Sequence, residues 1–340
     1  MNARLAIPAL LAAAALALGG CAAAPAPGDG DSDDGRIAVV AVTDAYGSIA
    51  EAIGGGAVEV TSIISGPAQD PHEYEASARD QLAVSQAQLV IVNGGGYDDF
   101  MTRLLQSSDA VVVSASEASG LMPQAAPGRS DQEAAADADA DDHADTEDHA
   151  DHAHAAEDSH DGHNHIEGFN EHVWYSIHAV EHIAEAITTQ LLALVPDQAD
   201  LIESNSSAFL AELDRLHDRV HALEHELGGG DIISTEPVAA YLLEDLGFHD
   251  ATPAAFLTAI ESGSGVSARI LDDVLRSVEG GGIRFLAVNP QSAGPEAERV
   301  RAAAEGAGVP VIEFAETLPA GLDYLGWMAS NLDAVEHALQ

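Results

Sequence analysis

The chain has 340 residues, a formal net charge of −45 at pH 7, a single cysteine and no lysine. A surface this acidic repels nucleic acid and anionic lipid and favours cations, so we expect no nucleic-acid partner. One cysteine also excludes an internal disulfide bond. Because an acidic, lysine-free composition can equally reflect salt adaptation, the charge by itself identifies no function.

The N-terminus has the pattern of an exported protein. Residues 1–20 contain one arginine and a short apolar run that ends in Leu-Gly-Gly before Cys21, which predicts a signal peptide rather than a membrane span. Small residues before a cysteine resemble a bacterial lipobox, and that resemblance implies cleavage before Cys21 and lipidation of its thiol. Residues 21–35 are small, acidic and rich in Pro and Gly, which predicts a flexible tether.

Residues 36–195 are expected to form a first α/β lobe. Short apolar runs alternate with helical patterns, and near-continuous apolar strands separated by helices are typical of a parallel sheet covered on both faces. The expected strands are 36–43, 58–65, 88–94 and 110–117, and helical segments are expected around 44–55, 76–86 and 97–107.

This pattern stops within the same lobe at residues 118–168, which are rich in Ala, Asp and His. A stretch this long without apolar periodicity is either functional or disordered, and we expect disorder here. We expect it to bind several metal ions weakly, and an inert solvated spacer is the alternative. Seven of the sixteen histidines of the chain are accessory weak ligands in this view: His143, His149, His152, His154, His160, His163 and His165.

A long helix is predicted to link this lobe to the next, over residues 196–228. Pro196 breaks the preceding helical run, Asp197 is expected to cap the helix, and Gly228–Gly230 end it. Apolar residues recur at helical spacing along its length, which predicts one buried stripe. The stripe consists of Ile202, Phe209, Leu213, Leu216, Val220, Leu223 and Leu227.

Residues 229–340 repeat the alternation and predict a second α/β lobe. The expected order is strand 231–236, helix 237–246, a poor strand near 248–257, helix 267–278, strand 283–290, helix 296–305, strand 309–314 and a helix after Leu322. The fold class is therefore α/β, with two lobes that each hold a mostly parallel four-stranded sheet with flanking helices, joined by one long helix.

Four residues combine metal-binding side chains with a suitable position. His72 follows the second strand, His172 lies where the ordered chain resumes, Glu236 ends the first strand of the second lobe, and Glu316 follows the last strand. Ligands of open α/β sheets bind beyond the carboxyl ends of strands. Two imidazoles with two carboxylates suit Zn²⁺ and also Mn²⁺. Taken singly, each residue also has a structural explanation, and the nearby Glu313 could replace Glu316.

Two further patterns are interpreted as structural. Gly94–Gly96 follow a strand and precede a helix, but they lack the lysine of a phosphate-binding loop, so a turn beside the interlobe cleft is expected. Histidines four residues apart can share a helix face, as metal ligands do, but a surface stripe is expected for both sets. These sets are His178 with His182, and His217 with His221 and His225.

The order of motifs resembles the metal-binding lipoproteins of ABC importers for zinc and manganese, the class with a rigid interlobe helix. The matching features are the lipobox, Asp70-Pro71-His72-Glu73-Tyr74, NGGGYDDFM (93–101), NEHVWYS (170–176), Glu236-Pro237, NPQ (289–291) and ETLP (316–319). The resemblance implies a metal site formed by His72, His172, Glu236 and Glu316. Zinc members often have a third His at position 236, and many members have Asp at position 316. The two glutamates of this chain are harder ligands, which weakens a pure zinc assignment.

The resemblance predicts an extracytoplasmic solute-binding protein, anchored by lipid to the outer face of the cell membrane. It would bind Zn²⁺, with Mn²⁺ as the alternative, and deliver it to an ABC permease with its ATPase, acting as a monomer and not as an enzyme. A surface adhesin or metal buffer is a second alternative. A metallohydrolase is a third, but four protein ligands would fill the coordination shell, and the sequence has no HExxH-type motif.

Overall fold

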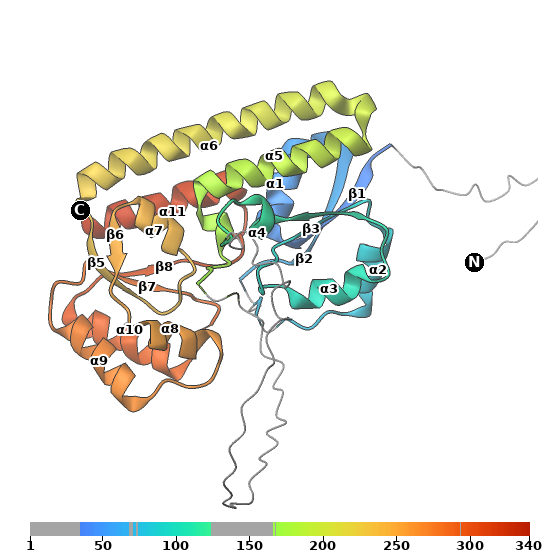
Figure 1. The fold of residues 1–340 in the computed structure, drawn as a ribbon. Coiled ribbons are helices and arrows are strands. Elements are labelled where there is room, and N and C mark those ends of the chain that lie inside the picture. Colours follow the sequence, from blue (N-terminus) through green and yellow to red (C-terminus); the bar gives the residue numbers. More distant parts are fainter. Residues whose placement is uncertain (1–34, 68–70, 73, 124–165, 167, 293) are drawn as a thin grey trace, which may run out of the picture. The chain divides into compact units, whose positions relative to one another are not determined.

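Two parallel sheets and a long helix organise the chain in the computed structural model (Figure 1). The structure describes residues 35–67, 71–72, 74–123, 166, 168–292 and 294–340. The predicted signal peptide, Cys21 and the seven loop histidines lie outside the described residues. None of the described helices combines the length and apolar character needed to cross a bilayer.

The first sheet has the strand order β2-β1-β3-β4, and all its strand pairs are parallel. Val39, in the central strand β1, pairs with Val60 on one side and Leu89 on the other. Apolar side chains on both faces are buried because helices cover both faces, as the apolar strand pattern predicted. The elements are β1 (Ile37–Thr43), α1 (Asp44–Gly54), η1 (Gly55–Ala57), β2 (Val58–Ile64), α2 (Ala78–Gln86), β3 (Leu89–Val92), α3 (Asp99–Leu105), β4 (Val111–Ser114), α4 (Ala115–Ala118), η2 (Val173–Tyr175) and α5 (Ile177–Leu194).

The second sheet repeats this topology in shorter strands, with the order β6-β5-β7-β8 and parallel pairing throughout. The expected strand near 248–257 is wrong over most of its length, because the strand ends at Asp250 and a helix begins at Ala254. The elements are β5 (Gly230–Ser234), α7 (Ala240–Asp245), β6 (Phe248–Asp250), α8 (Ala254–Glu261), α9 (Ala268–Glu279), β7 (Leu286–Val288), α10 (Pro295–Ala307), β8 (Val311–Glu313) and α11 (Tyr324–Leu339).

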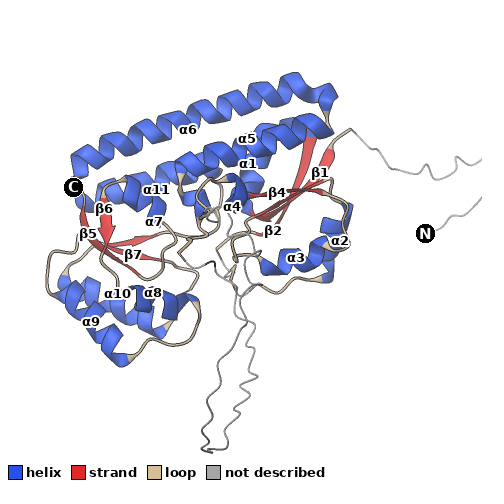
Figure 2. Ribbon diagram, in the orientation of Figure 1, coloured by secondary structure: helices blue, strands red, loops and turns tan. Residues whose placement is uncertain are grey.

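The long helix α6 (Ala199–Leu227) passes both sheets, as Figure 2 shows. All seven residues of its predicted apolar stripe are buried. The helix ends at Gly228, whose φ of 70° lies in the left-handed region that glycine tolerates, as expected. The predicted cap is wrong: Asp197 lies inside the short 3-10 turn η3 (Pro196–Gln198), and Gln198 precedes the helix without a side-chain cap.

A shared core joins the two lobes in addition to the long helix. One apolar cluster runs from the first sheet through α5 and α6 to α11, whereas a smaller cluster lies within the second lobe. Hydrogen bonds from the segment before α11 and from the first residue of α11 reach back to the first lobe. The Leu318 N–H donates to Asp44 at 2.9 Å, and the Tyr324 hydroxyl donates to the Trp174 carbonyl at 2.7 Å. The lobes are therefore packed together by their interiors, which opposes wide hinge opening.

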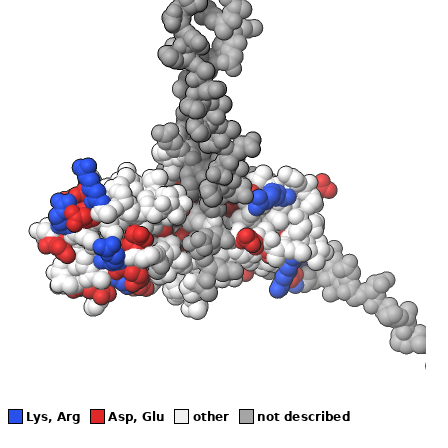
Figure 3. Space-filling view, turned by 90° about the horizontal axis from the view of Figure 1, so that it is seen from below, with Lys and Arg blue, Asp and Glu red and all other residues white. Residues whose placement is uncertain are grey.

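The charged side chains on the face drawn in Figure 3 are mixed in sign rather than gathered by sign. Ion pairs of opposite charge also occur among the described residues of the second lobe: Arg276 contacts Asp272 and Asp273 within one turn of α9, and Arg301 of α10 contacts Glu313. Exposed pairs of this kind contribute little to stability. Two arginines of the second lobe are therefore paired with carboxylates on the surface.

Candidate metal centre

His72 approaches the centre from the loop that follows β2. Its side chain is 11% exposed, and its ring meets the ring of Tyr97 edge to face, with 4.9 Å between the centroids. Tyr97 comes from the turn after β3, so both side chains lie beyond the carboxyl ends of the first sheet. This is the position expected for His72, and it leaves the side chain with a small exposure to solvent.

His172 is buried directly before η2 and is held in one orientation. The Oδ1 atom of Asn170 accepts the backbone N–H of His172 at 3.0 Å and lies 2.7 Å from its Nδ1 atom. The ring also packs edge to face on Trp174, with centroids 5.2 Å apart. An acceptor on Nδ1 leaves the proton of a neutral imidazole there, so that Nε2 presents its lone pair to the interior.

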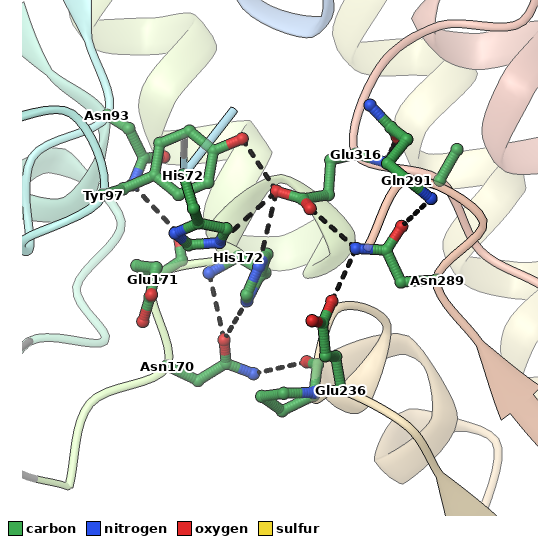
Figure 4. A network of polar contacts seen from close by, with 12 residues as sticks. His72, Asn93, Tyr97, Asn170, Glu171, His172, Glu236, Asn289, Gln291 and Glu316 are labelled. Atoms are coloured by element: carbon green, nitrogen blue, oxygen red, sulfur yellow. Dashed lines mark hydrogen bonds and ion pairs between the residues drawn. The ribbon is translucent and has the colours of Figure 1, made fainter. Parts of the chain in front are cut away.

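Glu316 brings the second lobe to these two imidazoles. Its carboxylate is fully buried, and Oε2 lies 3.6 Å from His72 Nε2 and 3.7 Å from His172 Nε2 (Figure 4). These separations are too long for hydrogen bonds. One ligand atom from each of the three residues fits within 4.8 Å. Two ligands bonded to one tetrahedral Zn²⁺ at 2.0–2.1 Å would be about 3.4 Å apart, so the spacing suits a shared ion.

The backbone and the second carboxylate oxygen of Glu316 are also fixed. Its N–H donates to Gln291 Oε1 at 2.6 Å, and the Tyr97 hydroxyl donates to Oε2 at 2.9 Å. The side-chain amide of Asn289 donates to Oε1 at 2.7 Å. Glu313, the alternative to Glu316, is exposed and pairs with Arg301 at 2.8 Å, so the structure places it outside this cluster.

Glu236 belongs to the same hydrogen-bond network, but it is connected to Glu316 only through Asn289. It is buried after β5, and its Oε2 atom accepts a hydrogen bond from Asn289 Nδ2 at 2.6 Å. The amide nitrogen of Asn289 therefore bridges the carboxylates of Glu236 and Glu316. Of the four residues predicted from the sequence, the structure brings three within ligand distance of one another and joins the fourth to them through Asn289.

The electrostatics of the centre hold a proton close to the ligand atoms. Burial disfavours the imidazolium of His172, but the carboxylates of Glu316 and Glu171 offset this and raise its pKa to about 9. For Glu236, in contrast, burial is the main cause that raises the pKa, to about 7, and the nearby Glu316 charge adds to that rise. Burial also opposes ionisation of Glu316, yet the two imidazoles and Asn289 hold the pKa of this carboxyl below its usual value.

The glycine turn before Tyr97 has a structural role, as expected. The backbone N–H groups of Asn93 and Gly94 donate to the buried Asp98 carboxylate at 2.7 and 2.8 Å, so they are not presented to a phosphate. Gly95 has a φ of 70°, and a Cβ there would lie 2.5 Å from Phe169. The turn thus places Tyr97 against the candidate ligands.

Four residues that fix the ligands were missed as functional residues in the sequence. Tyr97, Asn289 and Gln291 lie in segments that carry the family resemblance, but polar residues after a strand carry no signal that assigns them to particular carboxylates. Asn170 acts through the orientation of His172. The histidines of both helical sets lie on the surface, as expected, where they are exposed or partly exposed.

Comparison with known proteins places the chain in a family. A family model described as the periplasmic component A of a zinc-uptake complex matches residues 39–338. The manganese-binding lipoprotein MntA of Halalkalibacterium halodurans is 27% identical over 234 residues, covering 67% of this chain and 64% of that protein. The alignment therefore spans less than two thirds of that relative.

Solved structures share the fold. The periplasmic zinc-binding protein TroA of Treponema pallidum matches with a TM-score of 0.66 and 20% identity, over 90% of this chain and 99% of that chain. FpvC of Pseudomonas aeruginosa, solved with Mn²⁺, matches with a TM-score of 0.62 and 20% identity, over 90% and 98% of the two chains. Because the family model spans nearly all of residues 36–340, the chain belongs to the periplasmic zinc-uptake component A family, and its resemblance to metal-binding solute-binding proteins of ABC importers is confirmed.

Proposed function

We propose that this protein is the extracytoplasmic solute-binding component of a zinc ABC importer. The observation that carries the proposal is the convergence of His72 and His172 from the first lobe with Glu316 from the second, with ligand atoms within 4.8 Å. Two lobes that each supply ligands can enclose an ion that is cargo. The proposed partners are an ABC permease and its ATPase, and lipidated Cys21 would hold the protein at the outer face of the membrane.

In this proposal His72, His172, Glu236 and Glu316 are the metal ligands. His172 and Glu316 are fully buried, whereas His72 retains contact with solvent, so we assign His72 to the entry side. Glu236 would complete the shell by turning its carboxylate from Asn289 towards the ion. Since the lobes share one apolar core, the ion would enter and leave by shifts of the His72 loop and small tilts rather than by wide opening.

Zinc is proposed over manganese because of the nitrogen ligands. Two imidazoles with a carboxylate at tetrahedral spacing suit Zn²⁺, whereas Mn²⁺ is better served by a larger set of oxygen ligands. The matching family is described as a zinc-uptake component, while a relative at 27% identity is named for manganese. Two glutamates in the set keep manganese as the alternative cargo.

Metal analysis with direct competition tests this proposal. The purified full chain, stripped with a chelator, would be exposed to equimolar Zn²⁺ and Mn²⁺, and the bound metal would be measured. We expect one tightly held Zn²⁺ per chain that Mn²⁺ does not displace. Tight Mn²⁺ retained against Zn²⁺ would overturn the zinc assignment, and a His72→Ala variant that binds as tightly as the native chain would overturn the site.

No enzymatic step is proposed, because four protein ligands would leave no open position for a reacting water. A catalytic zinc site keeps such a position. Hydrolytic turnover by the zinc-loaded protein, lost in a Glu316→Gln variant, would contradict the transport proposal.

A further inference from the structure

The segment that carries His172 is hydrogen-bonded to the second lobe on both sides of this ligand. Before it, the Nδ2 atom of Asn170 donates to the Pro237 carbonyl at 2.8 Å. After it, the Tyr175 hydroxyl donates to the Ala315 carbonyl at 2.7 Å. Both hydrogen bonds therefore pass from the first lobe to the second close to His172.

The two accepting carbonyls belong to neighbours of the second-lobe ligands. Pro237 follows Glu236, and Ala315 precedes Glu316. Residues 170–175, the bridging segment, are thus bonded beside each of the two carboxylates that the second lobe supplies. These two hydrogen bonds connect the backbone around each carboxylate to the segment that holds the imidazole, although no candidate ligand takes part in them.

Two further hydrogen bonds hold the backbone of the bridging segment to helices of the second lobe. The Tyr241 hydroxyl of α7 donates to the Asn170 carbonyl at 2.8 Å, and the Tyr324 hydroxyl of α11 donates to the Trp174 carbonyl at 2.7 Å. Trp174 and Tyr175 are fully buried. Because a buried polar group that loses its partner destabilises the protein, we expect the bridging segment to follow the second lobe when that lobe moves.

The side chain of Asn170 connects these contacts to the His172 ring (Figure 4). Its orientation is fixed, because the backbone N–H of His172 can only donate to Oδ1 and the Pro237 carbonyl can only accept from Nδ2. The same Oδ1 atom lies 2.7 Å from His172 Nδ1. A shift of Pro237 away from the first lobe would turn this amide and remove the acceptor that orients the ring.

We propose that the bridging segment makes the position of the second lobe control how firmly His172 is held. Asn170, Tyr175 and Tyr241 are its positioning residues. The proposal rests on the proposed function, in which His172 binds the transported ion. Separation of the lobes would free the His172 ring in the same movement that withdraws the two carboxylates, so the ion would lose its ligands together. Intact hydrogen bonds along the bridging segment would therefore slow release of the ion.

The rate of Zn²⁺ release tests the proposal. The full chain, loaded with one equivalent of Zn²⁺, would be mixed with a chelator in a stopped-flow instrument. Tyr241→Phe and Tyr175→Phe each remove one hydroxyl donor and leave every candidate ligand in place. We expect release to be about fivefold faster in each variant, because one hydrogen bond is lost, and we expect the rate of binding to stay unchanged.

Ser108→Ala is the matched control, since the Ser108 hydroxyl donates to the Val84 carbonyl at 2.8 Å within the first lobe. This variant should release Zn²⁺ like the native chain. A purely structural role of the two tyrosines would lower the melting temperature without changing how fast the folded chain releases its ion. Release at the native rate in both tyrosine variants would overturn the proposal.

A double-mutant cycle tests the route through Asn170. Asn170→Ala should by itself speed release by about tenfold or more, since it removes a group that orients a ligand. Tyr241→Phe should then add less than about twofold, because the effect of Tyr241 on His172 passes through the Asn170 side chain. If the double variant shows the full effects of both substitutions, Tyr241 acts by another route and the proposal in this form is wrong.

Failure of the coupling and failure of the proposed function give different results. A His172→Ala variant that holds Zn²⁺ like the native chain would remove His172 from the metal site and overturn both. If His172→Ala loses the ion while both tyrosine variants release it at the native rate, the metal site stands and only the coupling is wrong.

Discussion

The two lobes contribute different chemistry to the same centre. The first lobe offers imidazoles that pack among aromatic rings, with His72 against Tyr97 and His172 against Trp174. The second lobe offers carboxylates held by an amide, with Asn289 donating to both Glu236 and Glu316. Nitrogen ligands favour borderline metals and oxygen ligands favour harder ones. Substitutions in the second lobe can therefore change which metal the centre prefers, while the two imidazoles of the first lobe remain the same.

Of the changes considered, removal of the Glu316 charge should lower Zn²⁺ affinity most, because it takes away the oxygen ligand that the second lobe places beside the imidazoles. Glu316→Gln keeps the shape of the side chain but removes the oxygen anion that lies 3.6 and 3.7 Å from the two imidazoles. We expect Zn²⁺ affinity to fall by more than about 100-fold, because substitutions of groups outside the ligand set already cost about 10–100-fold. Chelator competition measures the effect. Glu313→Gln, an exposed neighbour, is the matched control, and equal losses in both variants would remove Glu316 from the site.

The pH dependence of metal binding should show how the first lobe depends on the second. The pKa of His172 is about 9 in the metal-free protein, and binding requires the neutral imidazole, so protons compete with the ion below that pH. One displaced proton should lower the apparent Zn²⁺ affinity by about tenfold per pH unit, or about 100-fold from pH 8 to pH 6. Calorimetry in buffers of different ionisation enthalpy would count the released protons. An affinity that is flat between pH 6 and pH 8 would show that His172 holds no proton there.

The same raised pKa fixes the direction of a stability change in the metal-free chain. A group whose pKa is higher in the folded state stabilises that state below its ordinary pKa, here 6.5, and this contribution is lost as the pH rises through about 9. The melting temperature of the stripped protein should therefore contain a decrease over this window. Glu316→Gln should reduce that decrease, because the carboxylate is a cause of the raised pKa.

Loss of the Asn289 amide, which bridges Glu236 and Glu316, should change the metal centre through the second lobe alone. Asn289→Ala leaves all four candidate ligands in place but removes the donor that holds Glu236 and Glu316 together. We expect a loss of about tenfold in Zn²⁺ affinity, together with an altered ratio of Zn²⁺ to Mn²⁺ affinity. Asn205→Ala is the matched control, since its amide donates to the Ile53 carbonyl at 3.1 Å, away from the candidate ligands. An unchanged ratio in Asn289→Ala would mean that Asn289 does not set metal preference.

Deletion of residues 129–165 should have the smallest effect on the interlobe centre. This segment, which contains the seven loop histidines, lies outside the described residues, and the four candidate ligands do not include it. We expect the tight site to keep its affinity and several weaker equivalents of Zn²⁺ to disappear, as counted by titration. If the deletion abolishes tight binding while His72→Ala does not, the assignment of the two kinds of site is reversed.

Much of the fold could be predicted because the strands are apolar on both faces and the long helix has a regular stripe. The error at 248–257 arose where an apolar run contains both helical and extended possibilities: the segment Ala254–Glu261 is helical because Pro253 begins a turn that α8 continues. Asp197 failed as a cap because the chain first makes a 3-10 turn at Pro196, which moves the start of α6 past it.

The candidate ligands could be found in the sequence, whereas their support could not. His72, Glu236 and Glu316 follow strands, and topology alone brings such positions to one edge of each sheet. The roles of Asn289 and Tyr97 depend on which carboxylate each side chain reaches across a distance of many residues, and no local pattern encodes that.

The segment before α11 has a consequence for how the protein folds. The Leu318 N–H in this segment donates to Asp44, 274 positions earlier, and the N–H of Tyr324, the first residue of α11, donates to Ser48, 276 positions earlier. Contacts of this separation must wait for a large loop to close, which slows folding. The first lobe can therefore complete its interior only after the last helix has been synthesised, so a chain that stops before residue 315 should fail to reach the native state even though its first sheet is entire.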